Sequence, residues 1–269
     1  MERTLAIIGT GRMGEALLSG LLRSGWLEPT RVMCTARREE RCRELNRAYG
    51  VFATTANQQA IGASDVVVLA VKPQSVNALL EQDAVAFRSG QTVISVIAGV
   101  PTARIEAAIG GDVPVVRVMS NVPVQVDEAM SVLSPGAHAS EEDLKVAEEI
   151  LRHVGKVLRL PEEHLDSVTA LSGSGPAYFF LLAEAMIDAG ILLGLPRDVG
   201  TELIVQTMVG SAKMLRDTGR HPVELREMVT SPGGTTIAAV RELEQARVRA
   251  AFLNAIEAAK LRSEELARS

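Results

Sequence analysis

Short apolar runs without polar alternation recur through the first part of the chain. Leu5 to Ile8, Val66 to Val71 and Thr92 to Ile97 are clear examples. A run of this kind predicts a strand covered on both faces, as in a parallel sheet with helices on each side. The pattern predicts further strands over Arg31 to Thr35, Val113 to Met119, Met130 to Ser134 and Lys156 to Leu160, with helices between them. Such alternation is typical of a doubly wound α/β fold.

From His164 onward, the apolar positions recur at helical spacing almost throughout. The change falls at Pro161-Glu162-Glu163, so we predict a nucleotide-binding domain over residues 1–161 and an all-α domain over residues 162–269. An all-helical half with this much apolar surface is expected to bury part of it against another subunit. The expected helices are Ala177 to Leu193, Arg197 to Arg216, Pro222 to Met228, Ile237 to Gln245 and Arg249 to Leu266.

Composition narrows the class of partner. The chain has 269 residues and is 47% hydrophobic, which is ample for buried cores. Its net charge is −5, and its lysines and arginines are spread along the chain, so the basic patch of a nucleic-acid-binding protein is missing. We therefore expect a small-molecule partner and no nucleic acid.

Cysteine usage and hydropathy indicate a cytoplasmic protein with no membrane partner. Cys34 and Cys42 are too few for a disulfide framework, and neither belongs to a metal-ligand cluster, so no metal is expected. Met1 to Thr4 lead directly into an apolar strand, without the longer apolar core of a secretory signal. The longest apolar stretch, Tyr178 to Leu195, contains two carboxylates and is predicted to be a buried helix rather than a membrane span.

A glycine motif follows the first expected strand, with the sequence Gly9-Thr10-Gly11-Arg12-Met13-Gly14. Between a strand and a helix, G-x-G-x-x-G is typical of dinucleotide binding in a Rossmann domain. Gly9 permits the tight turn, Gly11 lets a pyrophosphate approach the backbone, and Gly14 lets the helix pack on the strand. The motif predicts a dinucleotide site at this end of the sheet.

The end of the second strand bears on which dinucleotide is bound. An NAD site usually offers a carboxylate there for the ribose 2′-hydroxyl. Here the chain reads Thr35-Ala36-Arg37-Arg38, with no carboxylate before Glu39. A hydroxyl followed by two guanidiniums suits a 2′-phosphate, so NADPH is favoured and NADH stays possible. The alternative is that the two arginines only open a solvated helix.

Polar residues and glycines follow the other expected strands. Lys72 follows one strand, Gly99 the next and Asn121 a third. Ligands of open parallel sheets lie outside the carboxyl ends of the strands, so these residues fall on the side where a nicotinamide would lie. For Lys72, a solvated loop lysine is an equal alternative.

A second candidate site lies in the helical half, in the stretch Val229 to Thr236, V-T-S-P-G-G-T-T. Thr235 and Thr236 are placed to cap a helix that begins at about Ile237. A helix start carries unpaired N–H groups and a partial positive charge, so the stretch can receive a small carboxylate. The alternative is an ordinary capped turn.

Taken together, these motifs and several others resemble pyrroline-5-carboxylate reductases over essentially the whole chain. The further segments, in order, are Ala70-Val71-Lys72-Pro73-Gln74, Arg117-x-Met119-x-Asn121-x-Pro123, Ala170-Leu171-Ser172-Gly173-Ser174-Gly175-Pro176-Ala177-Tyr178, Asp188-Ala189-Gly190, Gly194-Leu195-Pro196-Arg197, Gln206-Thr207 and Thr230-Ser231-Pro232-Gly233-Gly234-Thr235-Thr236. Two positions depart from the family pattern. Ser120 stands where proline is usual, which loosens the backbone there. The second strand ends in Thr35-Ala36-Arg37-Arg38, where many members have a Ser/Thr-Asn-Arg type of sequence, and this difference bears on the choice between NADPH and NADH.

The resemblance implies reduction of the C=N bond of 1-pyrroline-5-carboxylate to L-proline by NAD(P)H. It implies a Rossmann domain followed by a helical dimerisation domain, with a homodimer as the minimal unit and dimers often assembled into a decamer. The implied cofactor contacts are Gly9, Thr10, Gly11, Arg12 and Met13 for the pyrophosphate, Thr35 and Arg37 for the ribose phosphate, Asn57 for the ribose, and Ala70, Val71, Lys72, Pro73, Ala98 and Gly99 near the nicotinamide. Gly14, the last glycine of the motif, completes the predicted cofactor site.

The resemblance also implies a substrate site between the nicotinamide and the loop of the neighbouring subunit. Ser231, Gly234 and Thr235 would hold the substrate carboxylate, and Glu162 would line the same pocket. Thr236 would hydrogen-bond the ring nitrogen and is the expected catalytic residue. The sequence offers no His/Asp pair or catalytic-lysine motif as a general acid, which suits an already activated iminium.

Three other functions are alternatives for this sequence. A β-hydroxyacid dehydrogenase would need a helical G-x-x-x-K-x-x-x-N element, and the sequence around Lys213 does not match it. A reductase of other cyclic imino acids stays possible, because the loop reads a carboxylate and not ring size. A non-catalytic nucleotide-sensing protein of the same fold should have lost the glycines or the S-P-G-G-T-T loop, and both are intact.

Overall fold

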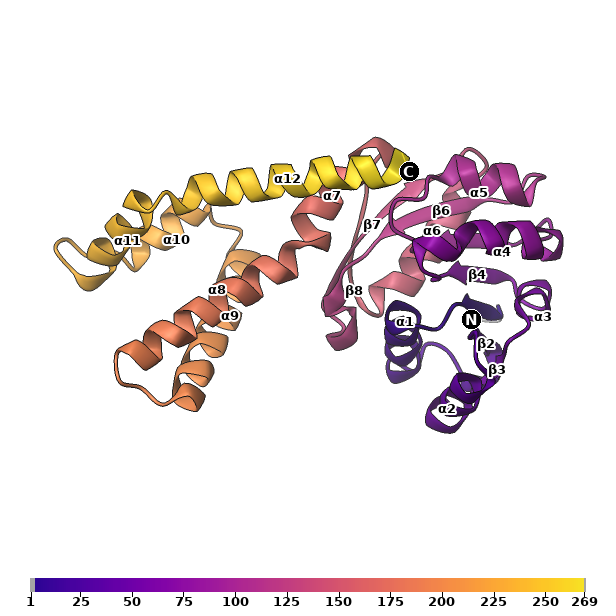
Figure 1. Cartoon of the computed structure of the whole chain (residues 1–269), viewed down its shortest axis with the longest axis horizontal. Helices are drawn as coiled ribbons and strands as arrows, with labels where there is room; N and C mark the ends of the chain where they lie inside the picture. The colour runs from indigo at the N-terminus through magenta and orange to yellow at the C-terminus, as the bar shows by residue number, and fades with distance from the viewer. Residues whose placement is uncertain (1–2, 269) are drawn as a thin grey trace. The chain divides into compact units, whose positions relative to one another are not determined.

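A computed structural model describes residues 3–268 of the chain. Its first part is an eight-stranded sheet in the order β3-β2-β1-β4-β5-β6-β7-β8 (Figure 1). Every neighbouring pair is parallel except β6 and β7, so the carboxyl ends of β1 to β6 share one edge. The strands are β1 (Leu5–Ile8), β2 (Val32–Thr35), β3 (Phe52–Thr54), β4 (Val66–Leu69), β5 (Thr92–Ser95), β6 (Val115–Met119), β7 (Ala129–Pro135) and β8 (Gly155–Arg159).

Helices cover both faces of this sheet, as the absence of polar alternation predicted. Along β1, Leu5 and Ile7 enter one hydrophobic core, whereas Ala6 and Ile8 enter the other. All four residues of β1 are buried, which explains why the strand is apolar throughout. The helices of this part are α1 (Arg12–Arg23), α2 (Glu39–Tyr49), α3 (Asn57–Gly62), α4 (Val76–Asp83), α5 (Thr102–Ile109) and α6 (Glu141–Arg152).

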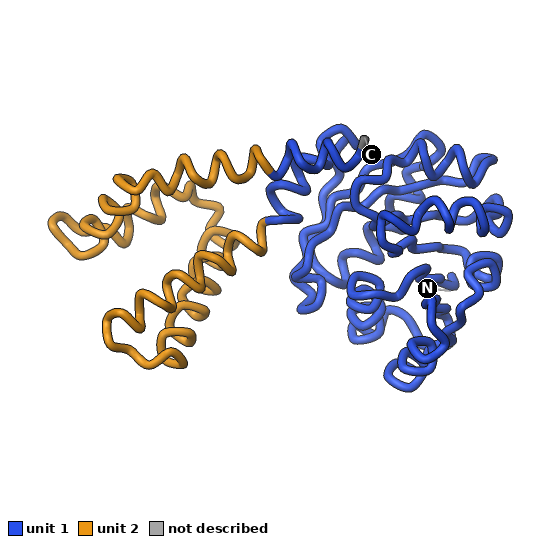
Figure 2. Tube along the Cα trace, in the orientation of Figure 1, with its two compact units in different colours: residues 1–174, 259–269 blue, residues 175–258 orange. Residues whose placement is uncertain are grey.

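The chain divides into two compact units (Figure 2). The first contains residues 1–174 and 259–269, and the second contains residues 175–258. The chain therefore leaves the first unit and returns to it, and the Ser263 hydroxyl donates to the Asp166 carboxylate across 97 residues of sequence, at 2.6 Å. Met1 and Glu2, where no secretory signal is expected, lie outside the described residues. The domain boundary after residue 161 stays a prediction.

The second unit is helical, as predicted. It contains α8 (Gly175–Leu192), α9 (Arg197–Thr218), α10 (Pro222–Met228), α11 (Thr235–Gln245) and the first half of α12 (Val248–Arg268). Helices α8 and α9 pack side by side, and a Cβ added to Gly190 would lie 3.8 Å from the Cα of Gly200, so small residues allow a close approach. The short α7 (Leu165–Val168) and a π-turn at Thr169–Gly173 precede α8.

The prediction that Tyr178 to Leu195 is buried was wrong for the single chain. Phe179, Phe180 and Leu181 are 61%, 66% and 66% exposed, and Gly175 is the buried residue of α8. Among the described residues, one helical run, Glu162–Leu192, is long and apolar enough by length and composition to cross a membrane, and 6% of its apolar window is buried. The apolar surface of α8 therefore needs a cover that the single chain does not supply.

Candidate functional site

The glycine motif forms a tight turn between β1 and α1. Gly9 has φ +87°, and a Cβ placed on it would lie 2.6 Å from Cγ1 of Val71. A Cβ on Gly14 would lie 3.0 Å from Cγ2 of Ile7, which is tighter than ordinary van der Waals contact. Gly11 differs, because nothing lies within 4 Å of the position its Cβ would take. The turn is closely packed at both ends and open in the middle, where a ligand would approach.

Helix α1 begins at this open position. Its N-cap is Gly11, and no side-chain hydrogen bond caps the helix. The first N–H groups of α1 and the positive end of the helix dipole are therefore available to an anion. This arrangement suits the pyrophosphate of a dinucleotide.

Thr35, at the end of β2, holds the glycine turn in place. Its hydroxyl accepts a hydrogen bond from the N–H of Gly9 at 3.1 Å, and its carbonyl accepts one from the N–H of Thr10 at 2.8 Å. Thr35 is 1% exposed and Thr10 is 3% exposed, and the Thr10 hydroxyl donates to the carbonyl of Ile7. Both threonines shape the turn from within, and their contacts with a cofactor stay predictions.

Arg37 and Arg38 are exposed at the start of α2, beyond the carboxyl end of β2. The helix that follows them is fixed to α1 through Glu15, whose carboxylate pairs with Arg41 at 2.5 Å and accepts the Tyr49 hydroxyl at 3.2 Å. Arg37 and Arg38 therefore lie between the end of β2 and the start of a helix that is bonded to α1. Their placement fits a phosphate site, and it fits the solvated helix start as well.

The turns after β4 and β5 follow the glycine turn in order along the same edge of the sheet. β1 pairs with β4 and β4 pairs with β5, so the segments that follow these strands are neighbours along one edge. A Cβ on Gly14 would lie 3.4 Å from Cβ of Ala70, which places the two segments in contact. Lys72 and Ala98 are exposed, and Gly99 has φ +74°. The structure thus brings together predicted cofactor residues from three separate turns.

Asn57 lies at the start of α3, on the same side of the first unit. Its amide nitrogen donates to the buried Asp83 carboxylate at 2.8 Å. Asp83 therefore orients the Asn57 amide, a role that no sequence spacing indicated. The predicted contact between Asn57 and the ribose stays a prediction.

Ser120, which stands where the family has proline, is tied down by a hydrogen bond. Its hydroxyl lies 2.9 Å from the hydroxyl of Ser131 on β7, and both side chains are buried. The adjacent Asn121 accepts from the N–H of Met130 and donates to the carbonyl of Ser172. The looseness expected from the missing proline is therefore countered by side-chain hydrogen bonds to the neighbouring strand.

Glu162 lies in a network of three donors. One carboxylate oxygen accepts from the N–H of Thr102 and from Arg117, each at 2.9 Å, and the other accepts from the Thr102 hydroxyl at 2.8 Å. Burial raises the pKa of the Glu162 carboxyl, but the hydrogen bonds from Arg117 and Thr102 lower it by more, so its pKa lies below the ordinary value. Both oxygens are engaged within the first unit, and the predicted contact of Glu162 with a substrate stays a prediction.

The Val229 to Thr236 stretch forms a turn ahead of α11 in the second unit. The N–H of Gly234 donates to the carbonyl of Ser231 at 3.1 Å, and Gly233 has φ +69°. The helix begins at Thr235 with Gly234 as its N-cap, and no side chain caps it. The prediction that Thr235 and Thr236 cap a helix starting near Ile237 was therefore wrong, because the two glycines let the helix start two residues earlier.

The open start of α11 leaves its first N–H groups without a side-chain partner. A Cβ on Gly234 would lie 2.3 Å from the Ser231 hydroxyl oxygen, so that hydroxyl sits at the amino end of the helix. Ser231 and Thr235 are exposed, and Gly234 and Thr236 are partly exposed. The residues predicted to hold a carboxylate are thus gathered at one helix start.

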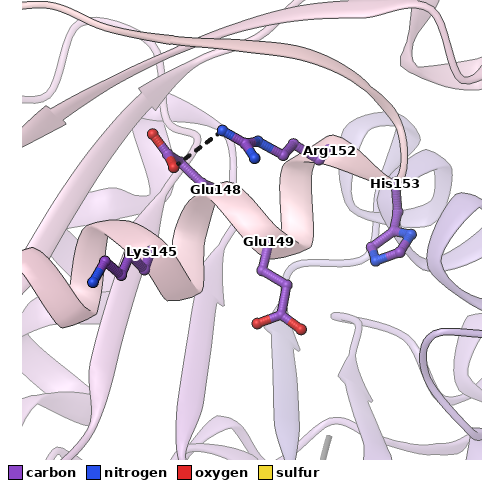
Figure 3. Close-up of a pocket in the computed structure, with 5 residues that line it drawn as sticks. All are labelled: Lys145, Glu148, Glu149, Arg152 and His153. Atoms are coloured by element: carbon purple, nitrogen blue, oxygen red, sulfur yellow. Dashed lines mark hydrogen bonds and ion pairs between the residues drawn. The ribbon is translucent and has the colours of Figure 1, made fainter.

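Two surface pockets coincide with the predicted site at one residue, Arg12. One, of about 430 Å³, lies over α6 and is lined by charged side chains of that helix and by His153 (Figure 3). Glu148 pairs there with Arg152 and Arg159, and Glu149 accepts from the Trp26 indole. None of its lining residues was predicted to bind a ligand, and their ion pairs are those of a solvated helix face. A second hollow of similar volume includes Arg12 of the glycine turn.

Two family models match the chain, one in each half. Residues 4–99 match the model described as NADP oxidoreductase coenzyme F420-dependent, and residues 162–266 match the one described as pyrroline-5-carboxylate reductase dimerisation. The apolar run of α8 falls within the second match. The fold and the open glycine turn thus define a dinucleotide-binding oxidoreductase with a helical dimerisation domain.

Several relatives that match almost the whole chain share one enzyme name. A pyrroline-5-carboxylate reductase of Corynebacterium melassecola is 44% identical over 98% of both chains. A solved structure of the Coxiella burnetii enzyme of the same name superposes with a TM-score of 0.91 at 36% identity, covering 99% of both chains. The pyrroline carboxylate reductase of Plasmodium falciparum, solved with NADP bound, has a TM-score of 0.89 at 27% identity and covers 99% of this chain and 98% of its own. The chain belongs to the pyrroline-5-carboxylate reductase family, and the predicted family and fold class are confirmed.

Proposed function

We propose that this protein reduces the C=N bond of 1-pyrroline-5-carboxylate to L-proline, the last step of proline biosynthesis, with NADPH as the reductant. The observation that carries the proposal is the full-length 44% identity to a pyrroline-5-carboxylate reductase, in a chain where both turns predicted to bind ligands are open. NADPH supplies the hydride when it is bound. The residues of this chain supply binding, orientation and hydrogen bonds.

The first unit would hold the cofactor. The open start of α1 at Gly11 fits a pyrophosphate. No protein atom lies within 4 Å of the position that a Cβ of Gly11 would take, and no side chain caps the first N–H groups of the helix. Arg37, exposed beyond β2, would pair with a ribose 2′-phosphate. The turns that contain Ala70 to Pro73 and Ala98 to Gly99 would receive the nicotinamide.

The start of α11 would hold the substrate. Its uncapped N–H groups and the Ser231 hydroxyl suit the carboxylate, and the hydroxyl of Thr236 would hydrogen-bond the ring nitrogen. A hydrogen bond to that nitrogen favours hydride transfer to the adjacent carbon, and the product nitrogen can take its proton from Thr236 or from water. An analogue that lacks the carboxylate should therefore bind much more weakly.

The working unit would be a homodimer in which a second copy covers the apolar surface of α8. Helices α8 and α9 expose large apolar side chains, and the matched family model describes a dimerisation segment. If the loop before α11 serves the cofactor of the partner subunit, each active site needs two chains and an isolated monomer is inactive. Assembly of dimers into a decamer is part of the same proposal, and so is a cytoplasmic location, which suits the two free, buried cysteines.

The test is the loss of NADPH absorbance on addition of 1-pyrroline-5-carboxylate to the purified protein. Parallel reactions with NADH, with 1-pyrroline and with six-membered cyclic imino acids address cofactor choice, carboxylate recognition and ring size. If only a six-membered imino acid is reduced, that compound is the substrate in place of 1-pyrroline-5-carboxylate. If NADPH binds but no imine is reduced, a nucleotide-sensing protein is favoured. Equal affinity for 1-pyrroline and its 5-carboxylate would contradict carboxylate capture.

A further inference from the structure

The start of α5 has an unusual cap. The N-cap residue is Pro101, which has no polar side chain, and no side-chain hydrogen bond of its own caps the helix. The carboxylate of Glu162 instead accepts the N–H and the hydroxyl of Thr102, the first residue of α5, although the two residues are 60 positions apart. A carboxylate at a helix start satisfies an unpaired donor and interacts favourably with the helix dipole. Glu162 therefore performs for α5 the task that a local Ser or Asp performs elsewhere.

This cap fixes a turn at the carboxyl end of the sheet. The chain leaves β5 at Ser95 and passes through Ala98 and Gly99 before it reaches Thr102. Gly99 adopts φ +74°, a conformation open to few other residues, and Ala98 is exposed. The turn is thus anchored by β5 at one end and by the Glu162 carboxylate at the other.

Arg117 anchors the carboxylate in turn. It lies on β6, paired in register with Ser95 of β5, and is 9% exposed. Its guanidinium donates to Glu162 at 2.9 Å, so the carboxylate is tied to β6 at the position that pairs with the last residue of β5. A charge-assisted hydrogen bond of this kind resists displacement of the carboxylate more strongly than a neutral one.

We propose that Glu162 is a positioning residue for the cofactor, which holds the Ala98–Gly99 turn in the shape that receives the nicotinamide by capping α5 through Thr102. The inference rests on the proposed function, in that it takes this turn to be part of an NADPH site. It assigns to Glu162 a role through Thr102 and Arg117, distinct from direct contact with the substrate.

The chain offers a matched control at the start of β5, the strand whose other end leads into the turn before α5. The Thr92 hydroxyl donates to the Asp143 carboxylate at 2.6 Å, and Thr92 is 5% exposed against 4% for Thr102. Both bonds join a buried threonine hydroxyl to a carboxylate at the start of a helix. Thr92 is the first residue of β5, however, so its bond lies at the opposite edge of the sheet from the predicted site.

The experiment compares Thr102→Val with Thr92→Val, each beside its serine variant. Dissociation constants for NADPH are measured by fluorescence titration without substrate, followed by KM for each substrate and by Tm. We expect both valine variants to lower Tm to a similar extent, because each leaves a carboxylate one hydrogen bond short. We expect only Thr102→Val to raise the Kd and KM for NADPH, by about tenfold or more, as for a lost bond to a charged group. Thr102→Ser, which keeps the hydroxyl, should restore both constants.

Two results would overturn the inference. One is an equal effect of Thr102→Val and Thr92→Val on NADPH binding, which would make the bond merely structural. The other is a Glu162→Gln variant that raises KM for pyrroline-5-carboxylate and leaves NADPH binding unchanged, which would make Glu162 a substrate contact. Wild-type protein that binds NADPH but reduces no imine would refute the proposed function alone, since the titrations need no substrate. Wild-type protein that does not bind NADPH would refute both.

Discussion

In the first unit, helices of the same chain cover both faces of the sheet, whereas in residues 175–258 the helices α8 and α9 leave large apolar side chains exposed. Ile7 and Ile8 of β1 are fully buried on opposite faces, while Phe180 of α8 is 66% exposed. The comparison shows that apolar content alone does not reveal whether an apolar surface is buried by the same chain or by another one. A sheet can be completed within one chain, but a long apolar helix in a small unit needs a partner.

The sharpest way to break this comparison is to place a charge on the exposed helix. Phe180→Asp should convert the oligomer to monomer and reduce kcat/KM by about a hundredfold, because in a two-fold symmetric interface the charge is introduced twice. Sedimentation and steady-state kinetics measure the two effects. The control is Val85→Asp in the first unit, where Val85 is 86% exposed. If Phe180→Asp stays oligomeric and active, α8 is not part of the interface.

The next test concerns the open turn of the first unit. Gly11→Ala should weaken NADPH binding by more than about tenfold, since the new methyl group enters the space through which a pyrophosphate would approach. Tm should change little, because nothing in the protein lies within 4 Å of that position. Gly62→Ala is the matched control, since its added methyl group also meets nothing within 4 Å. A large fall in Tm for Gly11→Ala would show that the glycine serves the fold instead of the ligand.

The corresponding test in the second unit is Thr236→Ala. We expect kcat/KM for pyrroline-5-carboxylate to fall by at least about tenfold, as for the loss of a hydrogen bond made in the transition state. Thr201→Ala, which removes an exposed hydroxyl bonded to a helix carbonyl, is the control. Unchanged kinetics would remove Thr236 from the mechanism and leave the proton on the nitrogen to water.

Lowering the pH should affect the stability of the two units differently, and this effect should be smaller than those of the substitutions above. Hydrogen bonds from Thr4 lower the pKa of Asp65, and those from Arg159 lower the pKa of Glu148. Burial raises the pKa of Glu162, but Arg117 and Thr102 lower it by more. A carboxyl whose pKa is lower in the folded state stabilises fully above its unfolded value, 3.8 for Asp and 4.5 for Glu, and less as the pH falls below it.

All three carboxyls belong to the first unit, so its stability should stay level from neutral pH to about pH 5 and decline below that. In the second unit, Arg249 lowers the pKa of Glu244, but that pair is exposed and is screened by salt. Tm measured against pH, at low and at high salt, tests the difference. A decline that vanishes at high salt would assign it to exposed pairs instead.

The sequence predicted the elements whose pattern is local. Leu5–Ile8 and Pro222–Met228 have the predicted bounds, because an apolar run and a proline at a helix start are signals within a few residues. β3 (Phe52–Thr54) and α3 were not predicted, since a three-residue edge strand with an exposed Phe52 carries no apolar pattern. The start of α11 was misplaced because its cap is a glycine and not a hydroxyl residue.

In the candidate site too, local patterns could be predicted from the sequence and contacts between distant residues could not. The glycine turn could be predicted from its spacing, but the commitment of Thr35 to the backbone of Gly9 depends on how β1 and β2 lie side by side. The link between Glu162 and Thr102 joins residues 60 positions apart, and no periodicity brings such residues together. Chemistry that lies within one turn can be read from the sequence, and chemistry that depends on two elements needs the fold.

The return of the chain to the first unit has a consequence for synthesis. Residues 259–269 belong to a unit whose other residues are the first 174, and Ser263 bonds to Asp166 across 97 residues of sequence. A ribosome that has made the entire sheet has yet to make the segment that fastens to it. The first unit is therefore completed only after the helical unit between its two parts has been synthesised.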